Sequence, residues 1–313
     1  MIKTQFYTKI NTKNGFRGAQ LKTWDYFNFI NSHPKFEAKI KFHQSSEWSD
    51  DVTWEKKQVL RGGELFERPD LLVLKGGQDW LLFKKQFNYS DIPIISPIVN
   101  YRVLNEDHPS NQLLELAAVR VCPNSDLKNK LIHYPKTKGQ VVCIPHGVNL
   151  PSKLIPINHK NIDLLIIALK NKKLGRQVFD YYKTFGKNVV FIDNYISHQE
   201  FMHKISVSKV SLHLPQPAET FYIPGLESLS MGVITIMPDC LGNIDYVKKI
   251  EGGFLCGYNF DEIINKTNWI LNLPLDQLDV FSQQAFLQSK AFSIEKERLQ
   301  WHELLEQVFN LQK

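Results

Sequence analysis

Apolar and polar positions alternate in blocks along the first half of the chain, and the blocks predict strands separated by helices. Residues 4–10 are rich in β-forming side chains, whereas Leu21, Trp24, Phe27 and Ile30 recur at the spacing of one helix face. A helix is therefore expected at residues 19–30, and further strands at 38–42, 71–74, 92–99 and 118–122. The run at 71–74 is continuously apolar and ends at Gly76 and Gly77, which is typical of a buried parallel strand.

The second half restarts the same pattern after an irregular stretch. Residues 150–160 carry prolines and asparagines with little periodicity, which indicates a linker after the strand that begins at Val141. Ser197 is a candidate N-cap for one of the helices that follow. The expected strands are 162–169, 188–192, 210–214 and 233–237, and the expected helices are 175–182, 197–205, 224–231 and most of 283–311. Both halves therefore predict α/β domains with helices on both faces of a parallel sheet.

Composition excludes several classes of protein. The longest apolar runs, at 164–169 and 233–237, fall far short of the roughly 20 residues needed to span a bilayer. The first seven residues contain no apolar signal segment, so we expect a cytoplasmic protein. The four cysteines lie far apart and form no C-x-x-C pair, which predicts neither a zinc knuckle nor a disulfide framework.

The net positive charge of the chain comes from its first half. Residues 1–145 carry 21 basic and 15 acidic side chains, whereas residues 146–313 carry 17 of each. This asymmetry favours an acidic partner or an anionic surface for the N-terminal half, and a solvated face is the alternative interpretation.

Two glutamates with seven residues between them form the most informative motif. Glu219 follows a predicted strand, and Glu227 is expected in the first turn of the next helix. Side chains at the carboxyl ends of parallel strands line ligand sites in such sheets. Carboxylates there accept hydrogen bonds from vicinal hydroxyls of sugars or riboses, and the amides of a helix N-terminus bind anions such as a diphosphate.

This segment resembles the E-x7-E motif of retaining GT-B glycosyltransferases, the group 1 family. It matches the motif at Glu219, Phe221, Pro224, Glu227 and Gly232. Further similarities to the family follow in the expected order at residues 144–149, 239–243, 246–247 and 253–255. The resemblance implies a GT-B fold, with two doubly wound parallel-sheet domains facing each other across a cleft. It places an N-terminal acceptor-side domain at 1–148, a nucleotide-sugar-binding domain at 149–285 and a helix that crosses back at 286–313.

The resemblance also implies roles for individual residues. Glu219 would contact the transferred sugar, and Glu227 would contact the nucleotide ribose. The backbone near the diphosphate or the sugar would come from Phe221, Tyr222, Ile223, Pro224 and Gly225.

The family supplies a basic pair to the diphosphate from the loop after the first strand of its C-terminal domain. In this chain Lys170 and Lys173 are the candidates, because a cation beside a departing diphosphate offsets its developing charge. The arginine that the family places at the start of this loop is missing, and a solvated lysine cluster is the alternative for at least one of the basic residues.

The N-terminal candidates are weaker matches to the family. Gly15 and Gly18 occupy the place of its glycine-containing first loop and are candidate donor contacts, since glycine permits close backbone approach. Arg17, Asp79 and His108 are candidate acceptor-side contacts, with solvated loop residues as the alternative.

The resulting hypothesis is a retaining, metal-independent hexosyltransferase that uses a nucleotide diphosphate sugar and no cofactor. No metal-binding D-x-D motif follows a predicted strand. The expected acceptor is a glycan or a glycolipid of a polysaccharide pathway, with peripheral contact at the inner face of a membrane through the basic half. Two alternatives stay open. One is a phage-type enzyme that glycosylates DNA bases, and the other is a non-catalytic nucleotide-sugar or glycan-binding module, favoured by Ser228-Leu229-Ser230 in place of Ala-Met-Ala.

Overall fold

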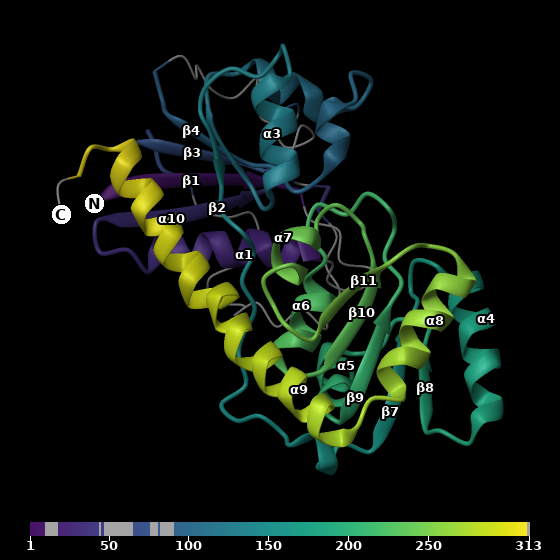
Figure 1. Cartoon of the computed structure of the whole chain (residues 1–313). Helices are drawn as coiled ribbons and strands as arrows, with labels where there is room; N and C mark the ends of the chain where they lie inside the picture. The colour runs from purple at the N-terminus through teal and green to yellow at the C-terminus, as the bar shows by residue number, and fades with distance from the viewer. Residues whose placement is uncertain (10–17, 44, 47–64, 76–80, 82–90, 312–313) are drawn as a thin grey trace. The chain divides into compact units, whose positions relative to one another are not determined.

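The computed structural model describes residues 1–9, 18–43, 45–46, 65–75, 81 and 91–311. The chain divides into two compact units (Figure 1). The first unit holds residues 1–145 together with 297–313, and the second holds residues 146–296. Each unit is built on its own parallel sheet.

The first unit contains a parallel sheet with the strand order β2-β1-β3-β4-β5-β6 in the described residues. Its strands are β1 (Ile2–Thr8), β2 (Phe36–Phe42), β3 (Leu71–Leu74), β4 (Ile94–Pro97), β5 (Val119–Cys122) and β6 (Val141–Cys143). Its helices include α1 (Gly18–Asn31) and α3 (Ser125–His133), and 3₁₀ turns cover Tyr101–Leu104 and Pro109–Glu115. β3 is buried along its whole length, as the apolar run predicts for a central strand.

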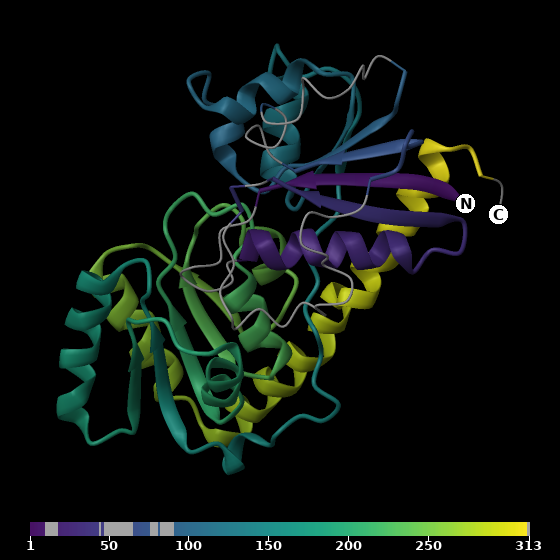
Figure 2. The ribbon, with the colours of Figure 1, turned by 180° about the vertical axis from the view of Figure 1, so that it is seen from behind.

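Aromatic packing attaches α1 to this sheet, beside β1 and β2 (Figure 2). The ring of Phe27 meets Phe6 of β1 edge-on at 5.8 Å, and Tyr26 and Ile30 are buried on the same helix. Of the apolar positions that predicted this helix, Phe27 and Ile30 pack in the core, whereas Trp24 is half-buried and Leu21 is exposed, so the spacing marks the buried face only in part.

The first unit also includes most of α10 (Ile294–Val308), from Glu297 onward. The indole of Trp301 is fully buried and lies 4.6 Å from the ring of Tyr26. Lys22 of α1 pairs with Glu297 at 2.6 Å, and both side chains are buried. Because a buried charge is tolerated only with a partner, this ion pair and the aromatic contact fix α10 against α1.

The second unit contains a parallel sheet with the strand order β11-β10-β9-β7-β8 in the described residues. Its strands are β7 (Ile162–Ile167), β8 (Val189–Ile192), β9 (Ser208–His213), β10 (Ile234–Pro238) and β11 (Gly253–Cys256). Its helices are α4 (Lys172–Tyr182), α5 (His198–Ser206), α6 (Ile223–Ser230), α7 (Ile244–Val247), α8 (Phe260–Leu271) and α9 (Leu275–Ser289), with 3₁₀ turns at Ile157–His159, Lys183–Phe185 and Lys290–Phe292.

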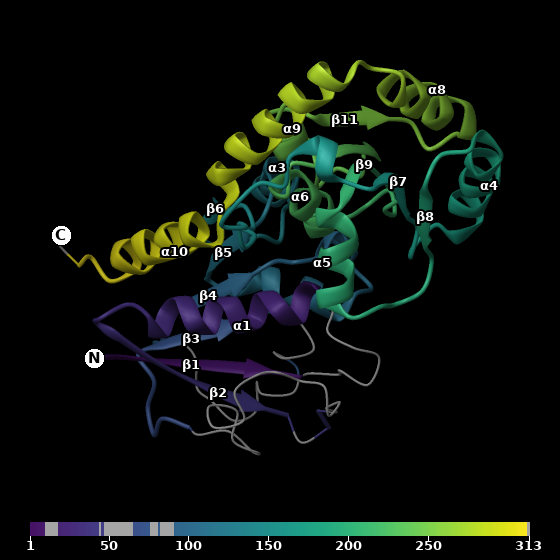
Figure 3. The same ribbon diagram turned by 90° about the horizontal axis from the view of Figure 1, so that it is seen from below.

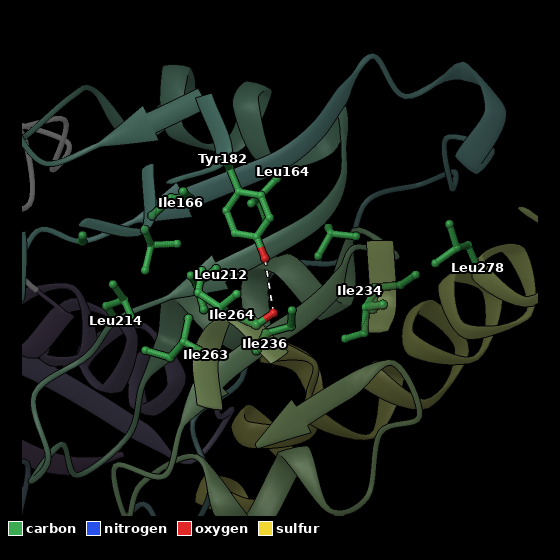
Figure 4. Close-up of a cluster of buried hydrophobic side chains, with 14 of the residues drawn as sticks. Leu164, Ile166, Tyr182, Leu212, Leu214, Ile234, Ile236, Ile263, Ile264 and Leu278 are labelled. Carbon is green, nitrogen blue, oxygen red and sulfur yellow. Dashed lines mark hydrogen bonds between the residues drawn. The ribbon is translucent and has the colours of Figure 1, made fainter. Parts of the chain in front are cut away.

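Alternating side chains of β7 pack on opposite faces of this sheet. Leu164 and Ile166 join the cluster formed with α4 and α8, whereas Leu165 and Ile167 join the cluster formed with α5. In Figure 3 the strands of this sheet lie between α8 and α5. Within the first cluster, the hydroxyl of Tyr182 donates to the carbonyl of Ile264 at 3.3 Å and links α4 to α8 (Figure 4). The central strand is thus covered on both faces, which explains its continuous apolar sequence.

Several element boundaries differ from the sequence expectations. α4 begins at Lys172 rather than at residue 175, so Gly175 lies inside the helix and does not start it. Glycine is required there because a Cβ would overlap the side chain of Ala168. α6 begins at Ile223, so Glu227 lies beyond its first turn rather than within it. The helical tail consists of α9 and α10, which are separated at residues 290–293.

The sequence pattern did not reveal α3 and α8. In each of these helices an asparagine side chain caps the first turn: Asn124 accepts from the amide of Leu127 at 2.7 Å, and Asn259 accepts from that of Glu262 at 2.9 Å. Among the helices of the described residues, none has the length and the apolar character needed to cross a membrane.

Candidate functional site

The loops after β7 and β9 leave the carboxyl edge of the second sheet side by side. β7 pairs with both β8 and β9, so the order of strands reverses at this point. Ligand sites in open parallel sheets lie outside the carboxyl ends of the strands at such a reversal. Lys170 follows β7 and Glu219 follows β9, which places both candidates at this edge.

Glu219 and Lys170 form an ion pair between these two loops. The ammonium of Lys170 contacts Oε1 of Glu219, and the side chains are 47% and 17% exposed, respectively. The structure therefore brings together two of the three candidate catalytic residues, with the carboxylate largely sheltered and the cation facing outward.

The backbone of Glu219 is hydrogen-bonded to the loop that follows β10. The amide of Glu219 donates to the carbonyl of Cys240 at 3.1 Å, and Glu219 forms a parallel β-bridge with Leu241. Leu241 adopts a left-handed conformation with φ of 67°. A Cβ at Gly242 would overlap the backbone of Glu219 and Thr220, so this close approach requires glycine.

Three consecutive backbone N–H groups at the start of α6 have no hydrogen-bond acceptor among the described residues. Within the described part of the chain, the N–H groups of Phe221, Tyr222 and Ile223 donate to no other residue. Pro224 has no N–H, and the amide of Gly225 already donates to the carbonyl of Tyr222 at 3.2 Å. Of the five residues expected near the diphosphate or the sugar, the first three thus offer backbone donors to an anion.

The side chains of the same segment serve packing. Phe221 and Tyr222 are buried, and the hydroxyl of Tyr246 donates to the carbonyl of Tyr222 at 2.8 Å. A Cβ at Gly225 would overlap the side chain of Met237. Burial raises the pKa of Tyr222 well above its ordinary value, so this hydroxyl stays protonated. The buried aromatic side chains therefore hold the loop in place, and its backbone N–H groups stay available as hydrogen-bond donors.

Glu227 has a histidine partner that the motif did not indicate. Nε2 of His198, the first residue of α5, lies 3.0 Å from Oε1 of Glu227. The two side chains are 64% and 14% exposed, respectively. The hydrogen bond to Glu227 raises the pKa of the His198 imidazole, because it favours the protonated ring.

The basic segment at the start of α4 divides into bound and unbound cations. Nζ of Lys172 donates to Oδ1 of Asn194 at 3.1 Å. The guanidinium of Arg176 binds Asp193 at 3.0 Å and lies 4.5 Å from the ring centre of Phe191. Lys173 is exposed and has no hydrogen bond or ion pair from its side chain to any described residue.

The N-terminal candidates lie in the first unit. Gly18 is the first residue of α1 and is exposed. His108 caps the 3₁₀ turn Pro109–Glu115, since its Nδ1 accepts from the amide of Ser110 at 3.2 Å. Gly15, Arg17 and Asp79 lie outside the described residues.

Three further residues lie at the site, and no spacing pattern pointed to them. They are His198, His213 and Tyr258. His213 is the last residue of β9, and burial lowers its pKa to about 3, so it is neutral. The hydroxyl of Tyr258 is buried without a hydrogen-bond partner among the described residues, and burial followed by nearby acidic groups, including Glu219, raises its pKa. Within the described residues, no three His, Cys, Asp or Glu side chains are grouped to hold a metal ion.

Solved structures with a similar architecture include two sugar-phosphate synthases and a protein in complex with UDP-glucose. Sucrose-phosphate synthase from Thermosynechococcus elongatus is 15% identical, with a TM-score of 0.69 over 100% of both chains. HepE from Anabaena in complex with UDP-glucose is 12% identical, with a TM-score of 0.68 over 98% of this chain and 100% of that chain. A UDP-forming trehalose-phosphate synthase from Burkholderia xenovorans is 7% identical, with a TM-score of 0.56 over 75% of this chain and 73% of that chain.

The chain is similar to known proteins in structure but not detectably in sequence. No protein-family model and no curated protein matches the sequence significantly. The two parallel sheets and their helices nevertheless superimpose on these solved structures over most of the chain. The chain therefore has the GT-B fold, as the order of its motifs predicted.

Proposed function

We propose that the chain is a retaining, metal-independent glycosyltransferase of the E-x7-E type, which transfers a hexose from a nucleotide diphosphate sugar to a hydroxyl of a glycan or glycolipid. One observation carries the proposal: the motif's Glu219 lies at the strand-order reversal, paired with Lys170 from the loop of the neighbouring strand. The GT-B fold and the UDP-glucose bound to HepE support a nucleotide-sugar donor.

The donor's diphosphate accounts for features that cost stability in its absence. The first turn of α4 contains Lys172 and Lys173 and no acidic residue, although the positive end of a helix dipole disfavours cations. A bound anion would reverse this repulsion. Lys170 and Lys173, with the unpaired amides of Phe221–Ile223, would hold the diphosphate, while Glu219 and Glu227 accept from sugar and ribose hydroxyls.

The proposed reaction makes and breaks one bond at the anomeric carbon. The bond from that carbon to the diphosphate oxygen breaks, and a bond from the acceptor oxygen forms on the same face. The acceptor proton passes to the departing phosphate. Lys170, Lys173 and the loop amides stabilise the negative charge that develops on the diphosphate, which is electrostatic catalysis by preorganised donors.

Ligand-dependent stabilisation tests the donor site first. Thermal denaturation of the wild-type protein is measured with UDP-, GDP-, ADP- and dTDP-sugars and with the free nucleotides. A ligand present at about 100 times its Kd adds about 2.7 kcal/mol to the free energy of unfolding. We expect one nucleotide to stabilise the wild type, Glu227→Ala to lose the effect and Lys170→Ala to show a smaller stabilisation than the wild type. Glu200→Gln is the control, since Glu200 is exposed and its side chain pairs, among the described residues, only with Lys204 at 3.4 Å.

The chemistry is tested on the donor that this measurement identifies. Release of nucleotide with an acceptor mixture, unchanged by a chelator, supports metal-independent transfer, and the anomeric configuration of the product by NMR tests retention. Donor binding without release of nucleotide in any acceptor screen would instead support the non-catalytic binding module. A DNA acceptor would show itself by binding that weakens steeply with salt.

The acceptor and the site of action belong to the same proposal. The excess of basic residues in the first half supports an anionic glycolipid acceptor at the inner face of a membrane. Co-sedimentation with vesicles of anionic and of neutral lipid tests this contact, and equal binding to both would contradict it.

A further inference from the structure

His198 is held in position by the start of its own helix. Oγ of Ser197 accepts from the amide of Glu200 at 3.1 Å and caps α5 at the residue before His198. α5 packs against α6 on one face of the sheet of the second unit. The cap therefore fixes the backbone from which the imidazole reaches Glu227.

The contact between His198 and Glu227 is asymmetric in burial. The carboxylate is 14% exposed, whereas the imidazole is 64% exposed and contributes little to the core. Oε1 of Glu227 is bound to His198, and Oε2 has no partner among the described residues. The imidazole thus immobilises one oxygen of a sheltered carboxylate and leaves the other as an open acceptor.

The charged group that raises the pKa of the His198 imidazole is Glu227. Glu227 of α6 supplies both the hydrogen bond and the charge that raise the pKa of His198. On its own helix, Glu200 pairs with Lys204 at 3.4 Å. In the loop before α5, Asp193 is bound by Arg176 at 3.0 Å.

We propose that His198 is a positioning residue of the donor site, which fixes Glu227 through Oε1 so that Oε2 meets a ribose hydroxyl of a nucleoside diphosphate sugar. This inference rests on the proposed function, because it requires a nucleotide at Glu227. A carboxylate that is already oriented loses less conformational entropy when the ribose binds, so the contact with His198 increases affinity. The protonated ring also makes the stronger, charge-assisted hydrogen bond.

Calorimetric titration of UDP-glucose at pH 7 tests the role, with GDP- and ADP-glucose used where UDP-glucose does not bind. We expect His198→Ala to raise the Kd about fivefold, which corresponds to the net free energy of one ordinary hydrogen bond. His198→Gln should recover most of the affinity, because its amide also donates to Oε1. His203→Ala is the matched control, since His203 is an exposed histidine of the same helix whose side chain has no hydrogen bond or ion pair with the described residues.

The pH profile separates positioning from a structural effect. UDP-glucose has no terminal phosphate that titrates near neutral pH, so the ligand itself is constant in charge. Wild-type affinity should fall as the pH rises through the pKa of His198, whereas His198→Gln should be flat over the same range. Equal affinity of His198→Ala and wild type, or parallel pH profiles, would overturn this inference alone. If the wild type binds no nucleotide sugar, the proposed function fails together with it.

Discussion

Nε2 of His213 lies 2.9 Å from Oγ of Ser228 in the interior of the second unit, and both side chains are fully buried. The pair joins the end of β9 to α6, the two elements that flank the Glu219–Tyr222 loop. Nδ1 of the same ring lies 3.4 Å from the hydroxyl of Tyr222. The serine that departs from the alanine of the E-x7-E pattern is therefore the hydrogen-bond partner of a histidine on the neighbouring strand.

Removing this hydroxyl should destabilise the protein. Ser228→Ala leaves Nε2 of a buried, neutral imidazole without a partner, which costs about 2 kcal/mol in the free energy of unfolding. Urea denaturation followed by circular dichroism measures the change. Ser230→Ala is the matched control in the same helix, because its hydroxyl bonds only the carbonyl of Glu227 and leaves no ring nitrogen unpaired. An equal loss in the free energy of unfolding in the two variants would show that the hydrogen bond to His213 does not stabilise the protein more than that of Ser230.

Lys160 gives the stability of the chain a specific pH dependence. Its Nζ donates to the carbonyls of Met231 and Gly232 at 3.0 and 2.9 Å and pairs with no carboxylate of the described residues, and burial lowers its pKa from 10.5 to about 7. Between these two values the unfolded chain binds the additional proton, so the free energy of unfolding rises with pH in that window. The contribution of Lys160 approaches ~1.4 kcal/mol per pH unit.

A comparison with Lys160→Met isolates this contribution from other titrating groups. The free energy of unfolding of both proteins is measured between pH 7.5 and 9.5. The difference, wild type minus variant, should increase with pH, because only the wild type loses the cost of the buried ammonium. Parallel curves would show that Lys160 is not the group responsible.

The sequence predicts those elements whose pattern is contained in neighbouring residues along the chain. Continuous apolar runs predicted β3 and β7, and the order of the motifs predicted the fold. Gly175 was misleading because glycine usually ends or interrupts helices, whereas here it permits contact with Ala168. The partners of Glu227 and Ser228 could not be predicted, since His198 and His213 come from other elements and meet α6 only through tertiary packing.

The buried ion pair between Lys22 and Glu297 should stabilise the first unit. Glu297→Ala removes the partner at 2.6 Å and leaves Asp25, at 2.9 Å, as the nearby carboxylate for a buried ammonium. We expect a loss of about 3 kcal/mol in the free energy of unfolding, in the range for breaking a buried pair. The double variant Lys22→Met, Glu297→Leu should recover much of it, because an apolar pair carries no desolvation cost.

A partly exposed pair provides the control for this experiment. Glu200→Gln, which breaks the pair between exposed Glu200 and half-buried Lys204, should change the free energy of unfolding by less than about 0.5 kcal/mol. A Glu297→Ala variant as stable as this control would contradict a stabilising role for the buried pair.

The lysines after β7 should differ in their effect on catalysis. Lys170 contacts Glu219, Lys173 is free of side-chain partners among the described residues, and Lys172 is already bound to Asn194. If a departing diphosphate is stabilised here, Lys170→Ala should lower kcat about 100-fold, the loss typical of one preorganised donor. Lys173→Ala should also lower kcat, whereas Lys172→Ala should stay close to wild type.

Nucleotide release from the donor sugar provides the rate, and calorimetric titration of the donor provides Kd for the same variants. A loss in kcat that exceeds the loss in affinity places the lysine's effect in the transition state, because uniform binding would change affinity alone. Lys170→Arg should retain part of the activity, since it keeps the charge beside Glu219. If Lys172→Ala were as impaired as Lys170→Ala, the effect would arise from the net charge of the loop and not from the geometry of the Lys170–Glu219 pair.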